Sequence, residues 1–220
     1  MPPSPRQTQH DRKFRKILKV AARLFAKKGY EKVSIEEIAW RLQLTKGSLY
    51  HYFKSKEEVL FLIQMDSLTF GITAQTRVLS SPAEPAAKLS EAISTHVAII
   101  TKEEVAGALK QQELILPPPM REKVIAARDR YEAIFSEIIR EGVEQGVFST
   151  PDIRLSSIAI LSMLNGIAKW YSPKGRKTLA EITDAMTNFI IRGLSGGQAR
   201  KLFSAGPPLL TTVEQGREKA

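Results

Sequence analysis

The sequence predicts an all-α protein in which an N-terminal three-helix domain precedes a larger helical body. Apolar residues recur at steps of three and four, and no segment shows the apolar–polar alternation of a strand. Residues that favour helix starts precede these apolar stretches, and glycine or proline follows them. Three such starts fall close together near the N-terminus, so the connections there must be short.

The first helix is expected to begin near Asp11 and to end at Gly29. Three prolines within residues 1–10 lead us to expect a flexible basic arm before it. Glycine at the end can adopt the left-handed conformation that closes many helices. The apolar stripe of this helix consists of Phe14, Ile17, Leu18, Ala21, Leu24 and Phe25.

The second helix should start at Ser34. Ser34 and Glu37 have the spacing of a capping box, and Val33 and Ile38 have that of a hydrophobic staple. The buried face should consist of Ile35, Ile38, Ala39 and Leu42.

A third helix should follow after a brief break. Thr45 can cap it, and it should run from Lys46 to about Tyr52 with Leu49 and Phe53 turned inward. Two short helices joined by a tight turn predict a helix-turn-helix, whose second helix can enter the major groove of DNA.

Beyond Lys56 the chain is expected to remain helical until about residue 194, where glycine, proline and charge return. Ser55 and Glu58 form a second capping box at the start of this part. The expected helices are 56–79, 85–104, 105–115, 119–146, 152–172 and 178–193, separated by proline- or glycine-containing breaks. The chain therefore divides into the arm 1–10, a helix-turn-helix domain 11–56, a helical domain 57–194 and a loosely ordered tail 195–220.

The positive charge lies at one end of the chain. Residues 1–56 hold 14 Lys and Arg against four Asp and Glu, whereas residues 57–220 hold 19 of each, so the first segment carries the whole net charge of +10. Clustered Lys and Arg bind polyanions by releasing counterions from phosphates, which makes double-stranded DNA the leading partner. On charge alone, a basic solubility tail or a membrane-surface helix would also fit.

Composition argues against an enzyme and against a bound metal or cofactor. The chain has no cysteine and only three histidines, His10, His51 and His96, and it lacks a catalytic-triad signature or metal-binding spacing. The N-terminus lacks the apolar stretch of a signal peptide, and no stretch approaches the roughly 18 apolar residues of a membrane span. We therefore expect a cytoplasmic protein without a membrane partner.

Ten residues around the predicted helix-turn-helix are candidates for DNA contact. Those at the start of the third helix should face base edges, where lysine and hydroxyl groups can pair with bases and glycine permits close approach: Thr45, Lys46, Gly47 and Ser48. The others should hold phosphates through side chains or helix N-termini: Ser34, Tyr50, His51, Lys54, Ser55 and Lys56. Tyr52 and Phe53 are better explained as core aromatics.

The segment VSIEEIAWRLQLTKGSLYHYFKSKEEVL resembles the DNA-binding domain of the TetR family of bacterial regulators, over about residues 13–60. Gln43 departs from the pattern, since many members carry glycine there. The resemblance implies a homodimer that pairs through the last two helices, here 152–172 and 178–193, and an effector pocket in the domain 57–194. The strongly apolar helix 152–172 agrees with pairing, although burial within one monomer would also explain it.

Candidate residues for lining the effector pocket are the aromatic and polar groups of the central helices, although each of them fits a structural role as well. They are Phe61, Met65, His96, Gln111, Tyr131 and Phe135. The segment containing Trp170, Tyr171, Pro173 and Gly175 is similar to members that respond to fatty acyl-CoA or other CoA thioesters. We expect a repressor that binds a pseudo-palindromic operator as a dimer and is released by a small molecule. The alternative is an architectural DNA-binding protein without an effector.

Overall fold

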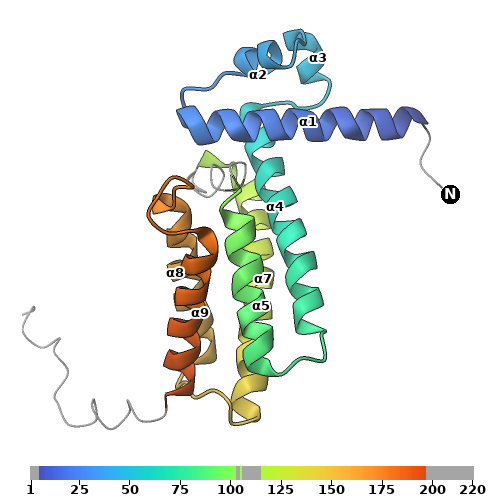
Figure 1. Ribbon diagram of the computed structural model, residues 1–220. Coiled ribbons are helices and arrows are strands. Elements are labelled where there is room, and N and C mark those ends of the chain that lie inside the picture. The colour runs from blue at the N-terminus through green and yellow to red at the C-terminus, as the bar shows by residue number, and fades with distance from the viewer. Residues whose placement is uncertain (1–4, 103–104, 106–114, 197–220) are drawn as a thin grey trace, which may run out of the picture.

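The computed structural model describes residues 5–102, 105 and 115–196, and every regular element in these ranges is a helix, as predicted. Three helices form a head at one end of the molecule, and the remaining helices form an elongated body below it (Figure 1). The helices of the head are α1 (Pro5–Lys28), α2 (Ile35–Arg41) and α3 (Lys46–Tyr50). Those of the body are α4 (Lys56–Leu79), α5 (Pro85–Ile100), α7 (Pro118–Glu144), α8 (Ile153–Trp170) and α9 (Leu179–Ser195).

Helix α1 starts earlier than the sequence suggested. It begins at Pro5, so residues 5–10 are helical and the expectation of an arm over residues 1–10 is wrong for them. The first position of a helix tolerates proline, because the N–H group that proline lacks has no partner there anyway. Residues 1–4 lie outside the described residues. The helix ends as expected at Gly29, whose φ of 82° is left-handed.

The short helices start at the predicted caps. The Ser34 hydroxyl accepts from the Glu37 amide at 3.1 Å, and the Thr45 hydroxyl accepts from the Ser48 amide at 3.1 Å. The Glu37 carboxylate does not complete the predicted box, because it pairs with Lys28 of α1 instead. Each cap supplies a side-chain acceptor for a backbone amide that the first turn would otherwise leave unsatisfied.

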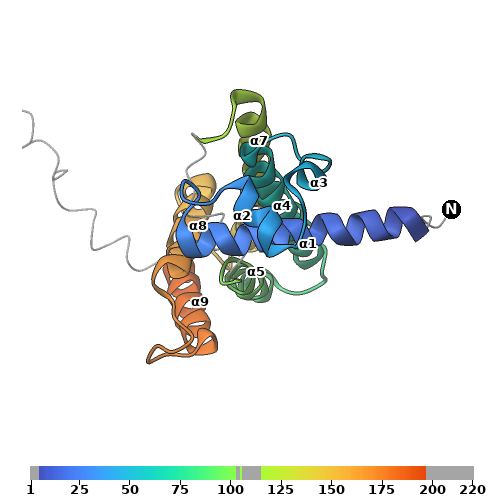
Figure 2. The ribbon, with the colours of Figure 1, turned by 90° about the horizontal axis from the view of Figure 1, so that it is seen from above.

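The core of the head extends past the expected boundary at residue 56. Val59, Leu60 and Ile63 of α4 pack with the buried residues of α1–α3, and so do Leu116 and Val124 beside the start of α7. Helix α4 runs unbroken from this core down the length of the body (Figure 1), and α1 lies across the upper end of the body when the molecule is seen from above (Figure 2). Helix α4 therefore connects the core of the head directly with the body.

The body helices end close to the predicted positions. Helix α5 stops at Ile100, four residues earlier than expected, whereas α4 has the predicted bounds. Most of the expected helix 105–115 and of the tail 195–220 lies outside the described residues. Among the described helices, none has the length and apolarity to cross a membrane.

Candidate nucleic-acid interface and ligand cavity

Helices α2 and α3 lie on the far side of α1 from the body, so their outer surface is open to a partner (Figure 1). In the turn between them, Leu44 donates to the Ala39 carbonyl at 2.9 Å. Gln43 has a φ of 56°, which is the left-handed conformation that glycine adopts readily. This geometry explains why the family pattern favours glycine at the position of Gln43.

The residues predicted to face bases gather at the start of α3. Thr45, Lys46 and Gly47 are exposed, and Ser48 is half-buried, with its hydroxyl 2.9 Å from that of Thr45. A side chain at Gly47 would meet no described atom within 4 Å. Glycine costs about 1 kcal/mol inside a helix relative to alanine, and no contact within the described part of the chain requires it at Gly47.

Lys46 is already engaged in the protein alone. Its ammonium forms an ion pair with Glu36 of α2, and hydrogen bonding in this pair raises the pKa of Lys46 and lowers that of Glu36. Both side chains are more than half exposed, so the pair is weak and can give way to a stronger acceptor.

The predicted phosphate contacts divide into two groups. Tyr50, the last residue of α3, is exposed, and so are His51 and Lys54 just beyond the helix. The Lys56 ammonium, by contrast, lies 4.1 Å from the centre of the Tyr30 ring and donates to the Tyr30 carbonyl at 3.2 Å. Sequence reasoning did not foresee that Lys56 is held inside the head.

The two serines among the predicted phosphate contacts, Ser34 and Ser55, serve as helix caps. The Ser34 and Ser55 hydroxyls accept from the amides of Glu37 and Glu58. Trp40, which the sequence analysis did not single out, is 71% exposed near the end of α2, with the Arg41 guanidinium 5.2 Å from its ring centre. The helical period that buries Ile38 and Ala39 already placed Trp40 on the outer side.

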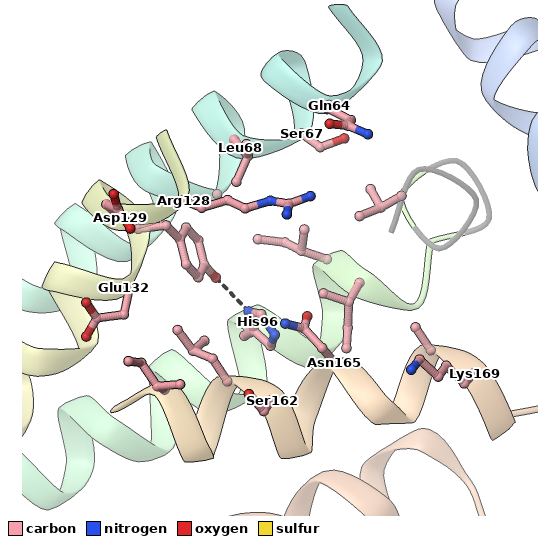
Figure 3. Close-up of a pocket in the computed structure, with 18 residues that line it drawn as sticks. Gln64, Ser67, Leu68, His96, Arg128, Asp129, Glu132, Ser162, Asn165 and Lys169 are labelled. Carbon is pink, nitrogen blue, oxygen red and sulfur yellow. Dashed lines mark hydrogen bonds between the residues drawn. The ribbon is translucent and has the colours of Figure 1, made fainter. Parts of the chain in front are cut away.

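A cavity of about 450 Å³ lies in the body, between α4, α5, α7 and α8 (Figure 3). This volume is within the range of small-molecule sites. Its apolar lining comes mainly from Leu68, Ile99, Ile100, Val105, Ile158, Leu161 and Ala168. Its polar and charged lining comprises Gln64, Ser67, His96, Arg128, Asp129, Tyr131, Glu132, Ser162, Asn165 and Lys169.

Two of the six predicted lining residues, His96 and Tyr131, are found at this cavity. Phe61 and Met65 instead pack against the core of the head, because their part of α4 serves that core. Phe135 is fully buried behind His96, with the two rings 6.0 Å apart in an edge-to-face arrangement. Gln111 lies outside the described residues.

A buried hydrogen-bond chain joins three helices at the wall of the cavity. Gln75 of α4 donates through Nε2 to the Ala92 carbonyl at 2.9 Å and to the Tyr131 hydroxyl at 3.1 Å. The Tyr131 hydroxyl lies 2.8 Å from Nδ1 of His96. Burial lowers the pKa of His96 to about 4 and raises that of Tyr131 to about 12, so both are neutral at pH 7.

Several buried polar atoms of the lining have no hydrogen-bond partner in the described part of the chain. They are both amide atoms of Gln64, Nε2 of His96 and Oδ1 of Asn165. Sequence reasoning missed Gln64 and Asn165, although each interrupts an apolar stretch of its helix. A buried polar group without a partner is costly, so these atoms favour a polar ligand in the cavity.

Models of known protein families match both the head and the body of the molecule. Residues 17–63 match the family of bacterial regulatory proteins called tetR, and residues 82–194 match the tetracyclin repressor-like C-terminal domain. The solved structure of the regulator PfmR from Thermus thermophilus is 37% identical, with a TM-score of 0.75 over 80% of this chain and 97% of PfmR.

Two further relatives illustrate the range of similar proteins. AibR, solved with isovaleryl coenzyme A and operator DNA, is 29% identical, with a TM-score of 0.74 over 80% of this chain and 96% of AibR. The transcriptional repressor KstR2 of Mycolicibacterium smegmatis is 24% identical over 84% of this chain and 92% of its own length. These matches confirm the resemblance seen in the helix-turn-helix segment: the chain belongs to the TetR family of bacterial regulatory proteins.

Proposed function

We propose that this protein is a dimeric repressor that binds a pseudo-palindromic operator through α3 and releases it when a small molecule enters the cavity. The observation that carries the proposal is the cavity with unpartnered polar atoms beside α4, the helix that reaches into the core of the head. A protein that only coats DNA needs no such cavity.

The exposed start of α3 supports base recognition by Thr45, Lys46, Gly47 and Ser48. A lysine can donate to guanine acceptors, and hydroxyls can pair with several bases. The absence of an internal reason for Gly47 among the described contacts favours an external one, namely close approach of the backbone to DNA. Tyr50, His51 and Lys54 are placed to contact phosphates, whereas Lys56 would have to leave Tyr30 to do so.

The outer faces of α8 and α9 support dimerisation. Leu155 is 62% exposed and Phe189 is 67% exposed, and Trp170 is exposed as well. Side chains added at Gly166 and Gly193 would meet no described atom within 4 Å. Large apolar groups next to open glycines allow two helix pairs to pack closely. A second copy of the chain is therefore the simplest partner that would bury these faces.

A CoA thioester is the effector class that we propose. AibR, a relative of 29% identity, was solved with one, and the matched motif of Trp170, Tyr171, Pro173 and Gly175 points the same way. The largely apolar cavity would take the acyl chain. Lys169 lines the cavity, and Lys174 and Arg176 are exposed just beyond α8, where they could meet the phosphates of the nucleotide.

The DNA-binding half of the proposal is tested by selecting an operator from genomic fragments and measuring its affinity together with that of random DNA. We expect Lys46→Ala to relax sequence preference, and Lys54→Ala to weaken all sequences alike and to reduce the salt slope by about one. Equal effects of both variants on cognate and random DNA would contradict this division of roles.

The effector half is tested by titrating operator complexes with acyl-CoAs of increasing chain length. Binding to the protein and loss of operator binding should occur over the same concentration range. Absence of binding at every chain length, together with stabilisation by another ligand class in a thermal-shift screen, would rule out CoA thioesters as effectors.

A further inference from the structure

The buried hydrogen-bond chain fixes the position of the proton on His96. The Ala92 carbonyl can only accept, so its 2.9 Å contact orients the Gln75 amide with Nε2 toward both Ala92 and Tyr131. The Tyr131 hydroxyl therefore accepts from Gln75 and has its own proton left to donate. We assign that proton to Nδ1 of His96, 2.8 Å away, because the hydroxyl has no other acceptor among the described residues.

A neutral imidazole that accepts at Nδ1 carries its hydrogen on Nε2. The ring is neutral because burial lowers the pKa of His96 to about 4. His96 is 4% exposed, it lines the cavity, and Nε2 has no hydrogen-bond partner among the described residues. Nε2–H is thus a buried donor without an acceptor.

The groups around Nε2–H indicate what kind of acceptor would fit beside it. Asn165 lies beside the His96 ring (Figure 3), and its side chain partly offsets the effect of burial on the pKa of His96, but neither Nε2 of His96 nor Oδ1 of Asn165 has a hydrogen-bond partner at bonding geometry among the described residues. Apolar side chains of α5 and α8, including Ile99, Ile100 and Leu161, supply most of the remaining wall. A ligand that suits this end of the cavity carries an uncharged acceptor on an apolar chain.

We propose that His96 is a specificity-determining residue, whose Nε2–H donates to the thioester carbonyl oxygen of the effector and so selects acyl-CoA over CoA derivatives that lack the thioester carbonyl. Gln75 and Tyr131 are positioning residues, because they hold His96 in the donating tautomer. This inference rests on the proposed function, in which a CoA thioester fills the cavity.

The test compares two ligands that differ at one group. Straight-chain acyl-CoAs and isovaleryl-CoA are titrated against the full-length protein by calorimetry, and the tightest binder is paired with its S-alkyl-CoA analogue, in which a methylene replaces the carbonyl. In the wild-type protein the analogue should bind about tenfold or more weakly, because it leaves the buried donor unpaired. The analogue should also be correspondingly poorer at releasing operator DNA.

Variants separate recognition from packing. His96→Leu should bind the thioester and the analogue with similar affinity, since it has no donor. Tyr131→Phe should reduce the preference for the thioester by a few fold, because it frees the alternative tautomer. Leu161→Ala, a change in the apolar lining, is the matched control and should weaken both ligands by the same factor.

Each result has a distinct meaning. Equal binding of the two ligands by the wild-type protein would overturn the role of His96 and leave the effector class intact. An undiminished preference for the thioester in His96→Leu would overturn it as well. If no acyl-CoA binds at any chain length, the proposed effector class fails, and the inference falls with it. The wild-type ligand pair is decisive even if a variant does not fold.

Discussion

At the residue scale, the corner between α7 and α8 depends on the missing side chain of Gly142. A Cβ atom there would lie 2.0 Å from Cδ2 of the buried Phe148 ring. The ring cannot withdraw easily, because the amides of Val147 and Phe148 both donate to the Gly142 carbonyl, at 2.8 and 2.9 Å. The Phe148 ring is therefore packed directly on the backbone of α7.

We expect Gly142→Ala to lower the free energy of unfolding by about 2–3 kcal/mol, since overpacking a rigid core forces the backbone to shift. Urea denaturation followed by circular dichroism measures the change. The double variant Gly142→Ala with Phe148→Leu should lose less than the sum of the two single changes, because leucine leaves room for the methyl group. Simple additivity would contradict the proposed clash.

His96 should make the stability depend on pH. Its pKa is about 4 in the folded protein and about 6.5 in an unfolded chain, so between these values only the unfolded state binds the proton. The free energy of unfolding should therefore fall as the pH drops from 6.5 toward 4, by at most about 1.4 kcal/mol per pH unit, and level off below that.

The measurement compares urea unfolding of the wild-type protein with that of His96→Leu at several pH values from about 4.5 to about 7.5, which cover most of the window between the two pKa values. Acidic residues contribute to both curves, so the difference between them isolates His96. The variant should lose less stability on acidification. Parallel curves would show that His96 is not held neutral.

At the scale of elements, the turn between α2 and α3 sets how α3 is presented. Gln43 occupies the left-handed region at the cost of about 1–2 kcal/mol that a side chain incurs there. Part of this strain would be relieved by glycine, although glycine loses more entropy on folding.

Gln43→Gly should therefore stabilise the protein by about 0.5 kcal/mol, and Gln43→Val should destabilise it by about 1 kcal/mol or more, because β-branched residues tolerate this conformation poorly. Thermal unfolding of the three proteins gives the order. Gly29→Ala is the control at the other left-handed turn of the head and should be destabilising. If Gln43→Gly is less stable than Gln43→Val, the backbone of Gln43 is not strained as proposed.

At the scale of the whole molecule, the proposed binding of a pseudo-palindromic operator requires two heads at a fixed separation, and the outer faces of α8 and α9 are the proposed junction. Phe189→Asp should convert the dimer to a monomer, because a charge cannot be buried between two apolar faces, and operator affinity should fall about tenfold or more. Light scattering coupled to size exclusion measures the mass. Phe70→Asp changes an apolar residue of α4 that is 55% exposed and should leave the dimer intact. If the Phe189→Asp variant remains a dimer, the interface lies elsewhere.

Sequence patterns that involve residues three or four positions apart predicted many of the helix boundaries and buried faces. The caps at Ser34, Thr45 and Ser55, the bounds of α4 and the inward Leu49 and Phe53 follow from interactions over three or four residues. The charge of residues 1–56 and the helix-turn-helix pattern pointed to the family without any tertiary information.

The cavity depends on contacts that no local pattern encodes. Gln64, His96, Tyr131 and Asn165 come from four helices and meet only after those helices pack, so the sequence could identify two of them and not the other two. For the same reason Phe61 and Met65 were predicted to line the pocket although they pack against the core of the head, and Lys56 was not seen to lie against Tyr30. Helical periodicity determines which face of a helix is buried, whereas the packing of distant helices determines what that face meets and where a space is left for a ligand.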